Sequence, residues 1–189
     1  MNPPSAPSPT GGLRVRTACL ADVAGLVQLV NSAYRGDSSR AGWTTEADLL
    51  DGQRTDAAAL QDFIEAGQRA GDRALLLFED EAGPAACVQL EQQGDKAYLG
   101  MLTIRPTLQA AGLGRALLAT AERHVREHWQ ARAVVMTVIE QRPELIAWYQ
   151  RRGYAPTGEF GAFPYGDARF GEPRRPDLRF VVLETRRQA

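Results

Sequence analysis

The feature that most constrains this chain is a glycine-bearing turn that separates an extended segment from an amphipathic helix. The extended run covers residues 98–106, and the turn covers residues 109–115 with the sequence QAAGLGR. Backbone N–H groups at a helix N-terminus are free to donate hydrogen bonds, and the helix dipole favours anions there. Gly112 and Gly114 lack the Cβ atoms that would keep an anion away from the backbone. The turn therefore predicts a pyrophosphate-binding site and a large phosphorylated cofactor.

Composition excludes several classes of protein. The net charge of −1 argues against a protein that binds nucleic acid mainly through its phosphates. No segment reaches the roughly 18 apolar residues that are needed to span a bilayer, so no membrane partner is expected. Cys19 and Cys87 form no metal-like pair, and we expect both to be buried free thiols in a reducing compartment. These observations favour a cytoplasmic globular protein.

The sequence predicts a single domain that follows a short N-terminal tail. Residues 1–12 are rich in Pro, Ser and Gly and lack an apolar signal-peptide core, so we expect a disordered tail. A total of 189 residues suffices for one domain with a proper core, here residues 13–186.

Apolar periodicity predicts an α/β domain without an internal repeat. Strands are expected at residues 13–18, 75–78, 85–90, 96–104, 133–139 and 178–184. Helices are expected after Asp22, from Thr45 to near Gly52 through a capping box with Asp48, after Asp56, from the glycine turn to near Trp129, and over 143–152. Loops are expected at residues 35–43 and 156–176. This order predicts a mixed sheet with helices on both faces.

Two motifs carry a resemblance to a known family. Residues 109–114 fit the pattern Q/R-x-x-G-x-G/A, and residues 149–154 (YQRRGY) fit Tyr-x-x-x-Gly-Phe/Tyr at the end of a helix. With both motifs in this order, residues 13–184 resemble the GNAT superfamily of acetyl-CoA-dependent N-acetyltransferases. The resemblance implies a central, mostly antiparallel sheet that splays between its fourth and fifth strands. The pattern departs at Arg142, where many relatives have Asn.

The resemblance also implies acetyl-CoA as a co-substrate and no metal. The glycine turn would bind the pyrophosphate through Gln109, Ala110, Ala111, Gly112, Leu113, Gly114 and Arg115. The preceding strand would pair its backbone with the pantetheine amides, because unpaired strand groups can accept an amide-bearing ligand as an added strand. The strand residues implied are Met101, Leu102, Thr103 and Ile104, and Arg142 and Ile146 complete the cofactor-binding set.

Tyr149 is the candidate general acid, since a phenol near the thioester sulfur could protonate CoA as it leaves. The general base is harder to assign. Neutralising an alkyl amine of pKa ~10.4 at pH 7 costs about 4.6 kcal/mol, so a carboxylate or a water chain must help, or the substrate amine must have a lower pKa. Some relatives carry a Glu on the strand before the glycine turn, but residues 98–104 hold no acid here. Glu140 is the first alternative and Glu91 the second. Direct attack in a ternary complex needs no covalent intermediate.

The acceptor pocket is predicted from loops rich in aromatic residues. Tyr34, Trp43 and Glu46 are the candidate acceptor-binding residues, and the aromatic loop at 163–167 is a second candidate. The near-neutral charge gives no acidic groove for a basic protein tail, which favours a small-molecule amine. Acetylation of protein N-termini or lysines is one alternative, and a non-catalytic acyl-CoA sensor is another. The resemblance also allows a homodimer.

Residues 124–128 (HVREH) match the H-x-x-E-H string of inverzincins. Two histidines at i and i+4 on a helix can share a metal ion. Val125 fits the apolar stripe of the helix, however, so we expect His124 and His128 to lie near its solvated end. The sequence therefore favours acyl transfer over a zinc peptidase.

Overall fold

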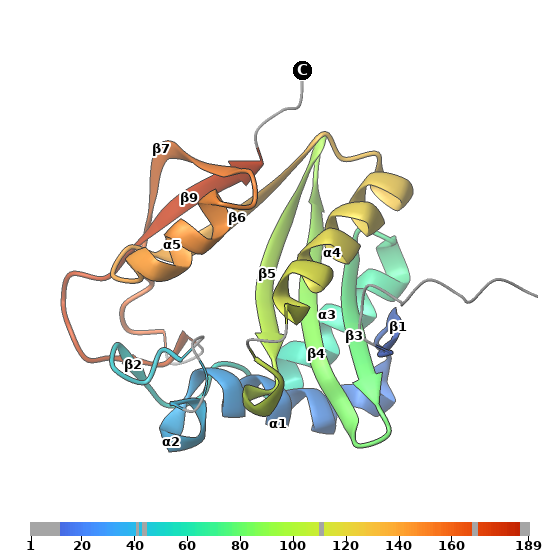
Figure 1. Cartoon of the computed structure of the whole chain (residues 1–189), viewed down its shortest axis with the longest axis horizontal. Helices are drawn as coiled ribbons and strands as arrows, with labels where there is room; N and C mark the ends of the chain where they lie inside the picture. The colour runs from blue at the N-terminus through green and yellow to red at the C-terminus, as the bar shows by residue number, and fades with distance from the viewer. Residues whose placement is uncertain (1–11, 41, 43–44, 110–111, 168–169, 186–189) are drawn as a thin grey trace, which may run out of the picture.

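A seven-stranded sheet forms the centre of the molecule, with its strands in the order β1-β3-β4-β5-β6-β9-β7 (Figure 1). The strands are β1 (Arg14–Thr17), β3 (Arg73–Asp80), β4 (Gly83–Gln93), β5 (Lys96–Ile104), β6 (Ala133–Ile139), β7 (Tyr154–Ala162) and β9 (Arg179–Thr185). The helices are η1 (Leu20–Asp22), α1 (Val23–Tyr34), α2 (Gly36–Ser39), α3 (Ala57–Ala70), η2 (Pro106–Leu108), α4 (Leu113–Trp129) and α5 (Pro143–Gln150). Two short strands, β2 (Leu50–Asp51) and β8 (Glu172–Pro173), pair separately.

The computed structural model describes residues 12–40, 42, 45–109, 112–167 and 170–185. The tail predicted at 1–12 lies outside the described residues except for Gly12. Trp43, Ala110, Ala111 and Arg186 also lie outside them. The described part of the chain holds no helix long and apolar enough to cross a membrane.

The sheet is antiparallel except where β5 meets β6. These two strands run parallel and pair only at Lys96 with Ala133, Ala97 with Val134, and Tyr98 with Val135. Beyond these pairs the strands diverge, and Figure 1 shows β5 and β6 separating toward their C-terminal ends. The predicted mostly antiparallel sheet, splayed between two central strands, is therefore confirmed.

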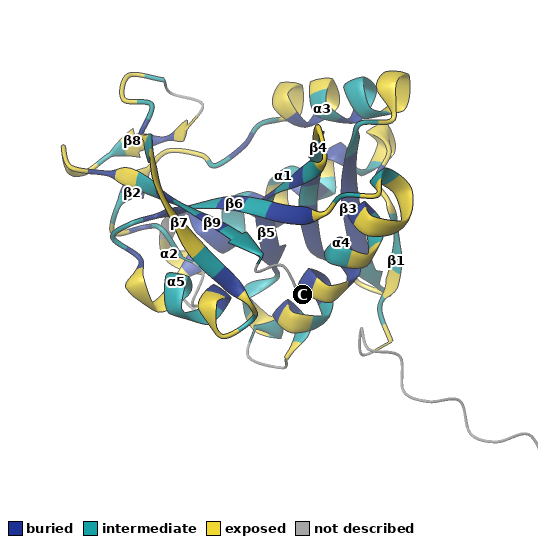
Figure 2. Ribbon diagram, turned by 90° about the horizontal axis from the view of Figure 1, so that it is seen from above, coloured by how far each residue is buried: buried dark blue, intermediate teal, exposed yellow. Residues whose placement is uncertain are grey.

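Helices cover both faces of the sheet, as expected. Along β3, Leu76 and Phe78 belong to the core beneath α4, whereas Leu75 and Leu77 belong to the core beneath α1 and α3. This alternation follows from the two-residue period of a strand, which points successive side chains to opposite faces. Full burial of each large apolar side chain contributes about 1.5–3 kcal/mol. Figure 2 shows the resulting buried strands between helices whose outer surfaces are exposed.

A bulge interrupts β5 just after the point where the two strands diverge. Cys87 pairs with Thr103 and Gln89 pairs with Gly100, so that Val88 faces two residues, Met101 and Leu102. Met101 has φ +48°, in the left-handed region that non-glycine residues seldom adopt. A bulge leaves its extra residue unpaired and bends the strand away from its neighbour. The sequence analysis did not predict this bulge.

Predictions for two segments and for one cysteine in the first half of the chain are wrong. No helix forms between Thr45 and Gly52; a turn leads instead into β2. The Thr45 hydroxyl bonds the Ser39 hydroxyl (2.6 Å) and the Ala47 N–H (3.2 Å), so it does not cap a helix. Within the predicted loop, residues 36–39 form the short helix α2. Cys19, expected to be buried, is exposed, whereas Cys87 is buried as expected.

The predicted loop at 156–176 contains most of β7 and the short strand β8. The strand β7 pairs with β9 at the edge of the sheet, with an irregular register between Pro156 and Phe160. An edge strand tolerates proline, because the missing N–H can face away from the partner. Most of β7 is exposed on both faces, so its sequence carries no apolar alternation. That absence explains why the pattern indicated a loop.

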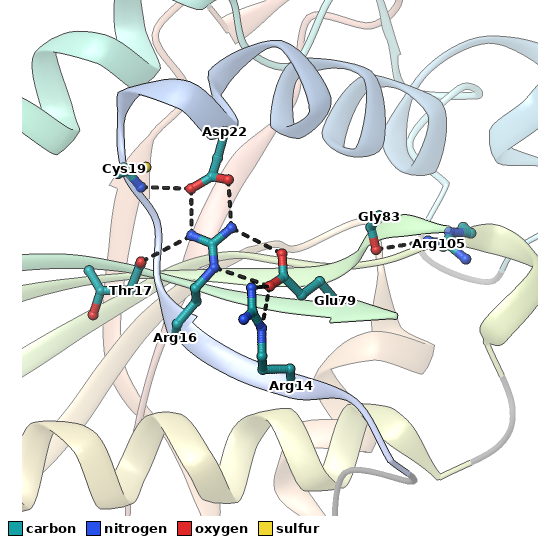
Figure 3. Close-up of polar contacts among 8 residues, drawn as sticks. All are labelled: Arg14, Arg16, Thr17, Cys19, Asp22, Glu79, Gly83 and Arg105. Atoms are coloured by element: carbon teal, nitrogen blue, oxygen red, sulfur yellow. Dashed lines mark hydrogen bonds and ion pairs between the residues drawn. The ribbon is translucent and has the colours of Figure 1, made fainter. Parts of the chain in front are cut away.

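An ion-pair cluster fixes the first strand to the start of α1 (Figure 3). The Arg16 guanidinium donates to both oxygens of Asp22 (2.7 Å each) and to Glu79 on β3 (3.0 Å). Asp22 immediately precedes α1, but its carboxylate accepts from the Cys19 N–H (2.8 Å) instead of capping α1. Hydrogen bonds from Arg16 hold the pKa of Asp22 at about 2. The cluster therefore ties β1, β3 and η1 together.

Candidate active site

A cavity of about 170 Å³ opens between the divergent ends of β5 and β6. Its aromatic lining comprises Tyr34, Tyr98, Tyr149, Phe163, Phe170 and Phe180. Its charged lining comprises Arg35, Glu46, Arg54 and Arg142. The Tyr98 hydroxyl on β5 bonds the Thr137 hydroxyl on β6 at 2.9 Å and bridges the two strands near the point where they separate. The cavity therefore combines apolar walls with a small number of charged groups, as small-molecule sites generally do.

Tyr149 of α5 lines this cavity and is only 6% exposed. Its ring packs edge-on against Trp148 and Tyr154, with centroid distances of 4.9 and 5.7 Å. Its hydroxyl has no hydrogen-bond partner among the described residues. Burial raises the pKa of Tyr149 above its usual value, so the phenol keeps its proton at neutral pH. The group is thus available to donate a hydrogen bond to a ligand in the cavity.

Tyr34, at the end of α1, also lies against the cavity but has a different role. Its hydroxyl donates to the Leu102 carbonyl oxygen at 2.7 Å. That bond joins α1 to the bulge in β5. Burial raises the pKa of Tyr34 to about 12. This residue therefore holds the bulged strand in position with a hydroxyl that is already bonded.

A buried ion pair forms part of the charged wall. The Arg35 guanidinium pairs with the Glu46 carboxylate, and their side chains are only 5% and 12% exposed. Arg35 also donates from Nη2 to the Phe170 carbonyl oxygen at 3.4 Å. The Glu46 N–H donates to the Tyr34 carbonyl oxygen at 3.0 Å, which fixes the backbone of the segment that carries this carboxylate. Sequence reasoning identified Tyr34 and Glu46 but not Arg35 or Arg54.

The predicted base, Glu140, does not line the cavity. Its carboxylate makes two hydrogen bonds with the Arg179 guanidinium, at 2.5 and 2.6 Å. Hydrogen bonding to Arg179 holds the pKa of Glu140 below its usual range. The second alternative, Glu91, lies 3.7 Å from Arg73 and also falls outside the lining. A carboxylate that lies outside the cavity lining is a poor proton acceptor for a ligand in the cavity.

The glycine turn opens α4 as expected. Gly112 is the N-cap of α4 and has φ +78°, which glycine adopts without strain. A Cβ on Gly114 would lie 3.1 Å from Trp148 on α5, so this glycine also permits close packing of the two helices. Gln109 donates from Nε2 to the Ile104 carbonyl oxygen at 2.9 Å and so joins the turn to the end of β5.

Positive charge gathers beside this helix start. Arg152 lies over the Trp148 ring, 3.5 Å from its centroid, and donates to the Trp148 carbonyl oxygen at 2.8 Å. Burial lowers the pKa of Arg152, and the nearby charges of Arg151 and Arg115 lower it further. A glycine-capped helix start with Arg115 in its first turn, and with Arg152 on the adjoining Trp148 ring, fits a diphosphate.

The remaining predicted cofactor residues lie along β5 and at the start of α5. Thr103 is buried and donates from its hydroxyl to the Met101 carbonyl oxygen at 3.0 Å. Arg142 precedes α5 and is 4% exposed, and its carbonyl oxygen accepts from the Ile146 N–H at 3.1 Å. Met101, Leu102 and Arg142 line the cavity.

The histidine motif forms a stacked pair instead of a metal centre. The rings of His124 and His128 lie 4.1 Å apart, and His128 Nδ1 is hydrogen-bonded to the His124 carbonyl oxygen at 2.9 Å. Burial lowers the pKa of His124 to about 4, so its ring is neutral at pH 7. Among the described residues, no group of three or more His, Cys, Asp or Glu is placed to hold a metal ion.

A splayed sheet, a cavity at the splay and a glycine-capped helix start beside it define an acyl-CoA N-acyltransferase architecture. The model of the acetyltransferase (GNAT) family matches residues 30–154, and the chain belongs to this family. It is therefore an acetyl-CoA-dependent acyltransferase.

Solved structures share the fold at low sequence identity. A ribosomal-protein-alanine N-acetyltransferase from Brucella melitensis is 17% identical, with a TM-score of 0.68, and the match covers 92% of this chain and 99% of that one. A putative acetyltransferase, yncA, from Salmonella typhimurium with acetyl-CoA is 18% identical, with a TM-score of 0.67 and coverages of 94% and 95%. The spermidine/spermine N-acetyltransferase SpeG from Vibrio cholerae is 14% identical, with a TM-score of 0.63 and coverages of 93% and 93%. No curated protein matches the chain by sequence.

Proposed function

We propose that this protein transfers the acetyl group of acetyl-CoA to the primary amine of a small molecule, by direct attack within a ternary complex. The observation that carries this proposal is the cavity at the splay, which is lined by both Tyr149, with its unbonded hydroxyl, and Glu46, with its carboxylate. A volume of about 170 Å³ suits a small acceptor better than a folded protein surface.

The co-substrate would enter along the splay. The glycine turn at 109–115 would receive the pyrophosphate at the start of α4, with Arg115 and Arg152 adding charge. The backbone at 101–104 would pair with the pantetheine amides, since β6 pairs with β5 only up to Tyr98. The acetyl group would then reach the cavity beside Tyr149.

Glu46 replaces Glu140 as our candidate for the proton acceptor. It is the one carboxylate among the described residues that line the cavity. An ammonium group beside Glu46 would pass one proton to this carboxylate as the amine attacks the thioester carbon. The C–N bond then forms and the C–S bond breaks, while the Tyr149 hydroxyl donates a hydrogen bond to the sulfur that carries the developing negative charge. The second proton of the attacking nitrogen passes to this sulfur, so CoA leaves as the thiol, Tyr149 keeps its own proton, and Glu46 releases its proton to solvent.

The experiment is an acceptor screen that measures release of free CoA from acetyl-CoA. We expect turnover with small amines, and we expect Glu46→Gln to lower kcat/KM by at least about tenfold, as typical of lost general base catalysis. Glu65→Gln is the matched control, because Glu65 lies on α3, pairs with Arg69 and falls outside the cavity lining. Glu140→Gln compares the two carboxylates directly.

Three results would contradict the proposal. Calorimetric binding of acetyl-CoA without turnover of any amine would indicate a sensor. Faster turnover of peptides than of small amines would indicate a protein acetyltransferase. A larger loss in Glu140→Gln than in Glu46→Gln would return the base to Glu140.

A further inference from the structure

The cavity carries more positive than negative charge. Its described lining contains the guanidinium groups of Arg35, Arg54 and Arg142 but only one carboxylate, that of Glu46. Arg142 is additionally bonded to Glu144, which lies outside the lining, at 3.3 Å. A site built for a polyamine or a lysine side chain would need the opposite balance, because like charges in a partly dehydrated site repel strongly.

The Arg35 guanidinium keeps a donor without a partner. Its side chain is 5% exposed, and its Nε has no hydrogen-bond partner among the described residues. Burial of an unsatisfied donor costs free energy, and the cost is larger for a charged group. Glu46 accepts from Nη1 and the Phe170 carbonyl oxygen accepts from Nη2, so Nε is the donor that is left without an acceptor. An anionic ligand group would supply the missing acceptor.

Arg54 supplies a second guanidinium to the same cavity. Its charged carbon lies 5.6 Å from the centroid of the Tyr34 ring, and no described carboxylate lies within ion-pair distance of its side chain. Arg54 also lines an adjoining cavity of about 260 Å³ that shares Met101 and Phe170 with the first. The two cavities therefore meet at an arginine without an acidic partner.

We propose that the acceptor amine also bears a carboxylate, which Arg54 and the Nε of Arg35 bind, so that the substrate is an α-amino acid with an apolar side chain. The apolar side chain follows from the walls formed by Phe163, Phe170 and Phe180. This inference rests on the proposed function, because Glu46 and Tyr149 would act on the amine at the other end of the same molecule. Guanidinium groups suit carboxylates, since their paired donors match the two oxygens.

The test compares each amino acid with its own amide, using leucine and leucinamide, then methionine and methioninamide. The amide keeps the side chain and the α-amine and removes only the negative charge. We expect kcat/KM to be about 10- to 100-fold higher for the acids, the range typical of hydrogen bonds to a charged group. The carboxylate of the acids raises the pKa of their α-amine, so a smaller fraction of that amine is in the reactive neutral form than in the amides. A preference for the acids would therefore be measured against this disadvantage.

Variants of Arg54 test the assignment further. Arg54→Gln should raise KM for the acids about tenfold or more and leave the kinetics of the amides within twofold, and Arg54→Lys should restore part of the preference. Arg69→Gln, on the exposed surface of α3, is the matched control.

Equal or better turnover of the amides would overturn the inference while the proposed function stands. Equal losses for acids and amides in Arg54→Gln would show a structural role and would also overturn it. If neither these compounds nor simple amines release CoA, the proposed function fails and this inference fails with it.

Discussion

Replacing Tyr149 with Phe removes one oxygen atom from a buried side chain and leaves the ring contacts with Trp148 and Tyr154 in place. The Tyr149 hydroxyl makes no hydrogen bond with any described residue, so the substitution breaks none in the free protein. We therefore expect the melting temperature to stay within a few degrees of the wild type, since a change of about 1 kcal/mol shifts it by only about 2–4 °C in a domain of this size.

The loss appears in the transition state, where the sulfur of the leaving CoA gains negative charge. A hydrogen bond to a charged group contributes about 1.5–3 kcal/mol, which corresponds to roughly a 10- to 150-fold loss in kcat. The raised pKa of Tyr149 argues for hydrogen-bond donation to the sulfur over complete proton transfer, because a phenol above its usual pKa of ~10 is a weaker acid than a thiol of ~8.5. The raised pKa also predicts that Tyr149 keeps its proton up to about pH 10. Ionisation of this residue should therefore cause no change in kcat below that pH.

The assay measures kcat from free CoA with both substrates saturating, and acetyl-CoA affinity by calorimetry. Tyr154→Phe is the matched control, because the Tyr154 hydroxyl donates to Glu122 at 2.8 Å and lies outside the cavity lining. Tyr154→Phe should lower stability and spare kcat. An unchanged kcat in Tyr149→Phe, or a fall in kcat that follows the loss of stability, would refute the role given to Tyr149.

Three further predictions concern the scaffold. Gly114→Val should lower the free energy of unfolding by about 1–3 kcal/mol in urea, because its side chain would overlap Trp148 and overpack the contact between α4 and α5. Tyr34→Phe should lower the free energy of unfolding by about 1 kcal/mol, because a buried hydrogen bond to the bulge is lost. It should also reduce kcat, and an unchanged kcat would show that the bulge has no part in catalysis. Asp22 has a pKa lowered to about 2 from 3.8, so its contribution to stability is complete above about pH 4 and is lost toward pH 2. The stability difference between wild type and Asp22→Asn should therefore shrink over that pH range, and a constant difference would contradict the ion pair with Arg16.

The sequence was sufficient for the features that arise from local patterns. The start of α4 at the glycine turn follows from residues 109–114, and the core of β3 follows from the uninterrupted apolar run at 74–78. The bulge in β5 is visible in the sequence as a shift in the apolar pattern, from which it could have been predicted. Ala97 and Leu99 face α4 at odd positions, whereas Leu102 and Ile104 face it at even positions. A change of phase within one strand is what an inserted residue produces.

The charged wall of the cavity could not be predicted in the same way. Arg35 and Glu46 are 11 residues apart and meet because the backbone at Glu46 is hydrogen-bonded to Tyr34 at the end of α1. Glu140 sits after β6, as its position in the sequence indicated, but a partner 39 residues away, Arg179, decides its chemistry. Burial and pairing of charges depend on tertiary contacts between distant segments, and no local periodicity records them.

The parallel pairing of β5 and β6 accounts for both the diphosphate site and the acceptor cavity. The rest of the sheet is antiparallel, and a parallel pair needs a crossover connection, which here is α4. The crossover places the N-terminus of α4 beyond the carboxyl end of β5, at the side where β5 and β6 diverge. Crevices outside the carboxyl ends of parallel strands are where α/β sheets commonly bind ligands. The diphosphate site and the acceptor cavity therefore share a cause, and a change that extended the pairing of β6 beyond Tyr98 would close the cavity and remove the pantetheine path together.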